Sequence, residues 1–98
     1  MVSTAAQTYT IGDVSVTSPR GTNQIDVTAD IQTTDSGAQV YVQSLRNGSV
    51  RDETDPVSVS ATQPQTFSVA GQNQADEVRV VLVDAGRSEQ ATRTVPYP

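Results

Sequence analysis

The side chains that could take part in chemistry are limited to hydroxyls, carboxylates and arginines. The 98 residues contain no histidine, no cysteine and no lysine, so all six basic residues are arginines. A serine nucleophile needs a neighbouring base, and the usual bases are histidine and lysine. Disulfides, thiolate metal sites and thiol catalysis are excluded as well. We therefore expect no enzymatic activity.

Carboxylates are the remaining candidates for acid–base catalysis or for calcium binding. Paired carboxylates can act as general acid and base, but Asp26 and Asp30 occupy outward positions of a predicted strand. The densest acidic cluster comprises Asp52, Glu53 and Asp55, and carboxylate oxygens in a loop can hold calcium. The cluster lacks the alternating aspartates and the glycine of a calcium-binding loop, so a solvated turn is favoured over a metal site. No phosphate-binding glycine loop occurs either, and we expect no cofactor.

Composition and spacing predict strands and no helix. Valine outnumbers leucine fifteen to two, and thirteen threonines accompany it, which favours strands. Apolar and polar residues alternate at every position of 25–32, as in a strand with one buried face. Similar patterns predict further strands near residues 8–18, 38–45, 57–62, 67–70, 78–83 and 88–95, separated by turn-rich clusters such as 21–23 and 71–73.

The first predicted strand, 8–18, changes parity midway. Its apolar residues are Tyr9 and Ile11 before the change, then Val14 and Val16 after it. A shift by one residue reverses the two faces of a strand. Residues 12–13, Gly-Asp, should therefore hold a bulge or a crossing between sheets.

The pair Asn47-Gly48 is the strongest turn signal in the chain. Both residue types tolerate positive φ, so the pair predicts a type I′ hairpin turn, followed by a short strand that ends in the acidic cluster. Asn47 also begins an Asn-Gly-Ser sequon. Glycosylation is expected there only if the chain is exported.

Seven or eight strands at about ten-residue spacing predict a single all-β domain over residues 1–98. We expect an antiparallel two-sheet sandwich of the immunoglobulin or fibronectin type III kind, with a small closed barrel as the alternative. Residues 1–7 would form an N-terminal arm and residues 96–98 a C-terminal tail. In layout the chain resembles prokaryotic adhesion-type sandwich modules and small virion structural proteins. It lacks the cysteine pair, the core tryptophan and the strand-F tyrosine of immunoglobulin domains.

Four residues are candidates for a protein interface: Tyr41, Leu45, Arg79 and Tyr97. In segment 38–45 both faces carry apolar residues, with Tyr41 and Leu45 opposite the valines, so the outer face is expected to be partly covered by a partner. Tyrosine and arginine are enriched in contact cores. For Arg79 and Arg93, pairing with carboxylates across adjacent strands is the alternative. Tyr97 lies between two prolines with no evident core to enter, so we predict that it anchors on a neighbouring subunit.

The charge pattern indicates a salt-rich environment. The net charge is −5, and lysine, ordinarily among the commonest residues, is missing. This composition resembles that of proteins from salt-in halophiles, where acidic self-repulsion is screened. A small acidic surface from a GC-rich genome or a cell-surface protein is the alternative. An acidic chain without lysine is a poor nucleic-acid binder, and no apolar run is long enough to span a membrane.

These observations predict a non-enzymatic structural or interaction protein. The most concrete expectation is a small virion component (capsid decoration, turret or tail) of a virus infecting a halophile. Its partners would then be copies of itself in a homo-oligomer or other capsid or tail proteins. The alternative is an adhesion or spacer module of a halophile cell-surface or secreted protein. The first residues lack the basic and apolar regions of a secretory signal, which favours the virion over an extracellular location.

Overall fold

The computed structural model describes residues 7–17, 24–59, 64–70 and 75–97. Within these ranges the chain forms only strands and turns, and no helix that could cross a membrane is present. The eight strands are β1 (Tyr9–Thr17), β2 (Gln24–Thr33), β3 (Gln39–Arg46), β4 (Ser49–Glu53), β5 (Val57–Ser58), β6 (Gln65–Ala70), β7 (Glu77–Val83) and β8 (Glu89–Pro96).

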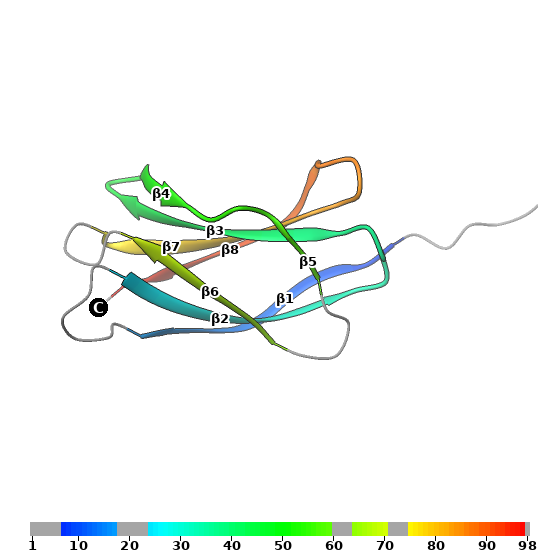
Figure 1. Cartoon of the computed structure of the whole chain (residues 1–98), viewed down its shortest axis with the longest axis horizontal. Helices are drawn as coiled ribbons and strands as arrows, with labels where there is room; N and C mark the ends of the chain where they lie inside the picture. The colour runs from blue at the N-terminus through cyan, green and yellow to red at the C-terminus, as the bar shows by residue number, and fades with distance from the viewer. Residues whose placement is uncertain (1–6, 18–23, 60–63, 71–74, 98) are drawn as a thin grey trace, which may run out of the picture.

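The strands form two antiparallel sheets that pack face to face (Figure 1). The three-stranded sheet has the order β1-β2-β6, and the five-stranded sheet has the order β4-β3-β7-β8, with β5 also paired to β3. The chain crosses from one sheet to the other after β2, β5 and β6, as in Greek-key sandwiches. The two-sheet sandwich predicted from the sequence is confirmed, in preference to a closed barrel.

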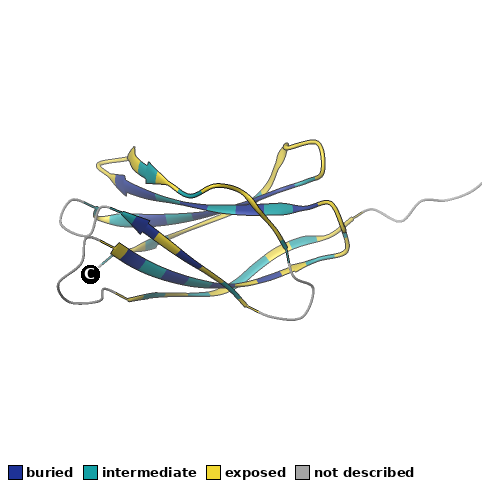
Figure 2. Cartoon of the chain, in the orientation of Figure 1, coloured by how far each residue is buried: buried dark blue, intermediate teal, exposed yellow. Residues whose placement is uncertain are grey.

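The core lies between the sheets and is built from alternate residues of the central strands (Figure 2). Strand residues of one parity point to one face, and in β2, β3, β6 and β7 that face is apolar. In β7 the core-facing residues are Val78, Val80 and Leu82. The buried cluster comprises Ile25, Val27, Ala29, Ile31, Ala38, Val40, Val42, Phe67, Val69, Val78, Val80 and Leu82.

A bulge interrupts β1 at residues 12–13, where the sequence changes parity. The register to β2 shifts between Ile11 and Val14, so that Ile11 lies opposite Ile31 and Val14 opposite Ala29. The extra residue returns the apolar side chains to the core face. Because β1 pairs with β2 on both sides of the shift, the predicted irregularity is a bulge and not a crossing between sheets.

The hairpin between β3 and β4 has the predicted type I′ turn. Arg46 pairs with Ser49, which leaves Asn47 and Gly48 as the loop, with φ angles of 52° and 81°. Two successive positive φ angles define the type I′ turn. β4 is short and ends at Glu53, also as predicted.

Several predicted features differ or fall outside the described residues. The strand predicted over 57–62 is described only as the two-residue β5, because residues 60–63 are not described. The turn clusters 21–23 and 71–73, residues 1–6 of the predicted arm and Pro98 of the predicted tail also lie outside the described ranges. β8 includes Pro96 as its last residue, because a proline that lacks a donor can still end a strand.

Candidate interaction surface

The outer face of the three-stranded sheet is polar throughout the described residues. Thr28 lies opposite Thr66, and Asp26 lies opposite Ser68, whose hydroxyl donates a hydrogen bond to the carboxylate (2.9 Å). Asp26 and Asp30 are acidic, and β1, β2 and β6 contain no arginine. This face therefore offers solvated hydroxyls and negative charge, and no apolar group large enough to anchor a partner.

The outer face of the five-stranded sheet is different, because it carries an apolar strip. Tyr41 on β3 lies opposite Val81 on β7, and Gln39 lies opposite Val83. Directly opposed residues project on the same side of a sheet. Val81 and Val83 are only 3% and 5% exposed, although they lie outside the core cluster. Their neighbours on this face shield them from solvent.

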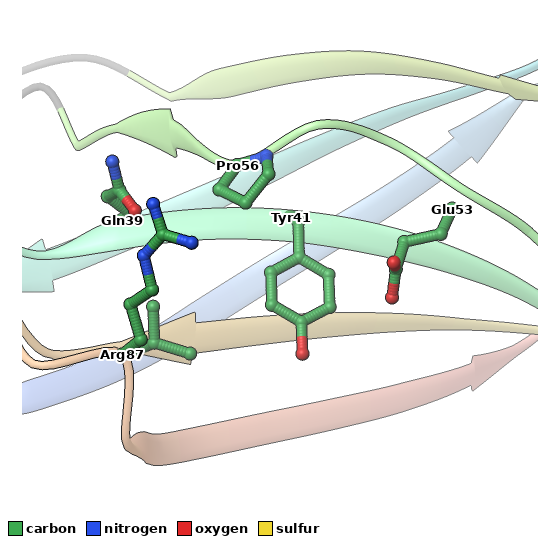
Figure 3. Close-up of a pocket in the computed structure, with 6 residues that line it drawn as sticks. Gln39, Tyr41, Glu53, Pro56 and Arg87 are labelled. Carbon is green, nitrogen blue, oxygen red and sulfur yellow. The ribbon is translucent and has the colours of Figure 1, made fainter.

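A hollow of about 260 Å³ opens on this face beside Tyr41 (Figure 3). We call it the Tyr41 pocket, and its lining residues are Gln39, Tyr41, Glu53, Pro56, Val83 and Arg87. The edge that contains β4 and β5 supplies Glu53 and Pro56, and the turn between β7 and β8 supplies Arg87. In Figure 1 that turn projects away from the three-stranded sheet, so it forms a rim of the hollow.

The backbone of Arg87 adopts a left-handed conformation, with φ of 66°. The Asp84 N–H donates to the Ser88 carbonyl (3.0 Å), and the Asp84 carboxylate accepts from the backbone N–H groups of Gly86 and Ser88 (2.9 Å each). These bonds fix the turn around Arg87. A left-handed residue with a side chain costs about 1–2 kcal/mol, so the turn holds Arg87 at the pocket against a backbone preference. Within the described part of the chain, its guanidinium has no hydrogen-bond or ion-pair partner.

Tyr41 lies in a mixed electrostatic environment. Partial burial raises the pKa of its phenol first, the Glu53 and Glu89 carboxylates raise it further, and Arg79 lowers it. The phenol is therefore neutral at ordinary pH and can donate a hydrogen bond. With Arg87 in the pocket lining, two carboxylates and two guanidinium groups surround the ring.

Two of the four predicted interface residues meet on this face. Arg79 lies on β7 next to Val81 in the outward row, and its Nη1 donates to Gln43 Oε1 (3.4 Å). Tyr41 and Arg79 are close enough for the guanidinium to lower the phenol's pKa. Arg93 faces the other way, opposite the core residue Val80. It forms no pair with a carboxylate in the described residues, because its Nη1 donates to the Gly12 carbonyl at the β1 bulge (2.6 Å).

The other two predicted interface residues lie elsewhere. Leu45 is fully buried, flanked by Val50 on β4 and Glu77 on β7, so it is not available at the surface. Strand parity predicts the face on which a side chain lies, but not how far its neighbours cover it. Tyr97 is half-buried against the chain's own core cluster, and its N–H donates to the Asp76 carbonyl (2.9 Å). The expectation that Tyr97 has no core to enter is therefore wrong.

The acidic cluster does not converge on a metal position. Asp52 accepts from the Ala70 N–H on the neighbouring sheet (2.9 Å), whereas Glu53 accepts from the Gln43 side chain on the outer face (2.7 Å). Adjacent strand residues point to opposite faces, which separates the carboxylates, and Asp55 is simply exposed. No group of three or more candidate ligands comes together in the ranges described.

The pocket residues other than Tyr41 were missed as a group by sequence reasoning. Glu53 was a candidate only as a calcium ligand, and Arg87 was not a candidate. The sequence Asp84-Ala85-Gly86 is typical of a turn, but it does not indicate that the next residue is left-handed. Asn47 is exposed in its turn, and its glycosylation remains a prediction.

Comparisons of this chain with protein-family models, curated proteins and solved structures gave no match.

Proposed function

We propose that this protein is a non-enzymatic structural and binding module that docks on another protein subunit through the outer face of its five-stranded sheet. The observation that carries the proposal is the contrast between the two outer faces. One is uniformly polar and acidic, whereas the other presents the half-buried Tyr41 beside Arg79 and Arg87, with Val81 and Val83 buried next to it. Tyrosine and arginine are enriched at the centre of protein interfaces.

At a finer level, we propose a small virion component (capsid decoration, turret or tail protein) of a virus infecting a halophile. Support comes from the short all-β chain, the absence of the common catalytic side chains, and the acidic composition without lysine. The second candidate is an adhesion or spacer module of a halophile cell-surface protein. Finding the chain at a fixed copy number in purified virus particles would support the first candidate, and finding it in the cell envelope would support the second.

Site-specific photo-cross-linking in the native assembly tests the contact face. Thr94 and Thr66 form a matched pair, because both are exposed threonines on edge strands of opposite sheets. Thr94 lies opposite Arg79 on the proposed contact face, and Thr66 lies opposite Thr28 on the polar face. A photoreactive residue at Thr94 should form a protein adduct, and the same residue at Thr66 should form none. Equal adducts from both positions, or an adduct only from Thr66, would reject the proposed face.

The proposed halophile origin predicts that salt stabilises the fold. The net charge of −5 opposes compaction in dilute buffer, and near 1 M salt the Debye length falls to about 3 Å. The melting temperature should therefore rise as KCl increases from dilute to multimolar concentration. Circular dichroism measures the melting temperature. Equal melting temperatures in dilute and in multimolar KCl would rule out the proposed halophile origin.

A further inference from the structure

We infer that the subunit docked on this face is a second copy of the same chain, related by a two-fold axis that crosses the strands at Tyr41. In this arrangement Arg87 of each copy pairs with Glu53 of the other. The inference rests on the proposed function and names its partner. It is carried by the placement of two opposite charges on either side of one ring.

The charges flank Tyr41 along the direction of β3 (Figure 3). Arg87 lines the pocket at the end where Gln39 lies, and Glu53 pairs in register with Gln43. Gln39 and Gln43 are about 13 Å apart along an extended strand. A two-fold axis in the plane of the interface, through the midpoint of the line from Arg87 to Glu53 and perpendicular to that line, places each arginine over the other copy's glutamate. An isologous interface requires this kind of reciprocal contact.

The local charge favours a like partner over an oppositely charged one. The whole chain carries −5, so two copies repel each other on average. Around Tyr41, however, Arg79 and Arg87 balance Glu53 and Glu89. The outer face of the three-stranded sheet has no arginine to balance its aspartates. Of the two sheet faces, only the one with Tyr41 has arginines that offset part of its carboxylates, which also include Glu77 opposite Leu45.

The unpartnered guanidinium and the size of the hollow agree with this arrangement. The turn holds Arg87 in a left-handed backbone, yet within the described residues no carboxylate binds it. A second copy supplies that carboxylate through Glu53. The pocket volume of about 260 Å³ is below the range of about 300–1,000 Å³ that small-molecule sites occupy. It is large enough for the end of an arginine side chain from the other copy.

The contact area predicts a weak, reversible dimer. Four strands spaced about 4.8 Å apart, each contributing about seven residues, give a face of about 450 Å² per copy. Two such faces bury about 900 Å² together, which is below the usual range for stable complexes. We therefore expect dissociation constants in the micromolar range or weaker, so that firm assembly depends on several contacts acting together.

Charge reversal with mixing tests the inference. Sedimentation velocity over about 1–300 µM chain, a range chosen for weak association, should show a reversible monomer–dimer equilibrium for the natural protein. Arg87→Glu and Glu53→Arg should each weaken self-association by at least about tenfold, because each places like charges together twice. An equimolar mixture of the two variants restores both pairs, and so does the double variant, so both should dimerise about as well as the natural protein.

The mixture is its own control, since a misfolded variant is not rescued by another variant. Asp30→Arg makes the same charge change as Glu53→Arg on the opposite sheet, and it should leave association unchanged. A natural protein that stays monomeric throughout, single variants that dimerise normally, or a mixture that stays monomeric would each overturn the inference. If the photoreactive Thr94 variant still captures a different protein, the proposed function stands while this inference fails. If it captures nothing, both fail.

Discussion

Replacing Ser44 by alanine should destabilise the fold through a bond between the two sheets. Ser44 is the one polar residue among the fully buried side chains of the described chain, and its hydroxyl donates to the Ala70 carbonyl at the end of β6 (2.8 Å). The Ala70 N–H donates to Asp52 on β4 (2.9 Å). Both backbone groups of Ala70 are thus held by the five-stranded sheet, although β6 belongs to the other one.

The expected loss follows from burial. A buried acceptor that loses its donor costs about 1–3 kcal/mol, and Ala70 is itself half-buried, so water can reach its carbonyl in part. We expect Ser44→Ala to lower the free energy of unfolding by about 1–2 kcal/mol. For a domain of about 100 residues this shifts the melting temperature by about 5–15 °C. Combined with Asp52→Ala, the loss should fall short of the two single losses together, because both act on one residue.

Thermal and urea unfolding of the purified variants measure these effects, and Ser68→Ala is the matched control. Ser68 also lies near the end of β6 and also donates a hydroxyl hydrogen bond, but it is exposed on the outer face. Its loss should change stability by about 0.5 kcal/mol or less. Equal shifts for Ser44→Ala and Ser68→Ala, or no shift for either, would refute the reasoning that this contact holds the sheets together.

Three further predictions concern the turns. Gly48→Val should lower the free energy of unfolding by about 1 kcal/mol or more, because a β-branched residue resists a φ of 81°. Equal stabilities of the Gly48→Val and Gly48→Asn variants in urea unfolding would disprove this. Arg87→Gly should stabilise the monomer by about 0.5–1 kcal/mol by relieving the left-handed strain, and unchanged stability in dilute solution would show that no strain exists. The Tyr9 hydroxyl donates to Asp35 (2.7 Å), a bond that raises the tyrosine pKa to about 12 and lowers the aspartate pKa. The folded state therefore loses stability as the pH rises from 10 towards about 12 and as it falls below about 4, and a Tyr9→Phe variant with the same alkaline slope would rule out the assignment.

Period-two alternation was enough to predict much of the fold. The parity change in the first strand located the bulge between Ile11 and Val14, because only an extra residue returns both side chains to the core. The pair Asn47-Gly48 specified its turn because few residues tolerate two successive positive φ angles. Both are local signals, and each depends on residues that are adjacent in the chain.

The same alternation did not predict that Leu45 is buried or that Tyr97 packs against the core. Burial of Leu45 depends on Val50 and Glu77, which flank it across two strand pairs. Burial of Tyr97, the last described residue, depends on its packing against the core cluster. Val50 is only five residues from Leu45, but Glu77 and most of the core cluster are distant in sequence, so alternation alone carried no information about these contacts.

The Tyr41 pocket was unpredictable for a related reason. Its lining comes from β3, from the edge segment with Glu53 and Pro56, and from the turn that follows β7. Those parts meet only once the register of three strands is set. Tyr41 alone could be proposed, because an apolar residue on the outer face of a central strand is anomalous without any knowledge of its neighbours.

The sheet edges of this sandwich also bear on how it associates. An edge strand with free N–H and C=O groups invites pairing with another chain. Here Arg93 donates a hydrogen bond to the Gly12 carbonyl on β1, and the Ala70 N–H on β6 donates one to Asp52. Pro56 interrupts the edge formed by β4 and β5. These contacts disfavour strand addition at three of the sheet edges, and the fourth edge, β8, ends at Pro96. In the proposed assembly, side chains of the outer face with Tyr41, and not backbone groups, contact the partner.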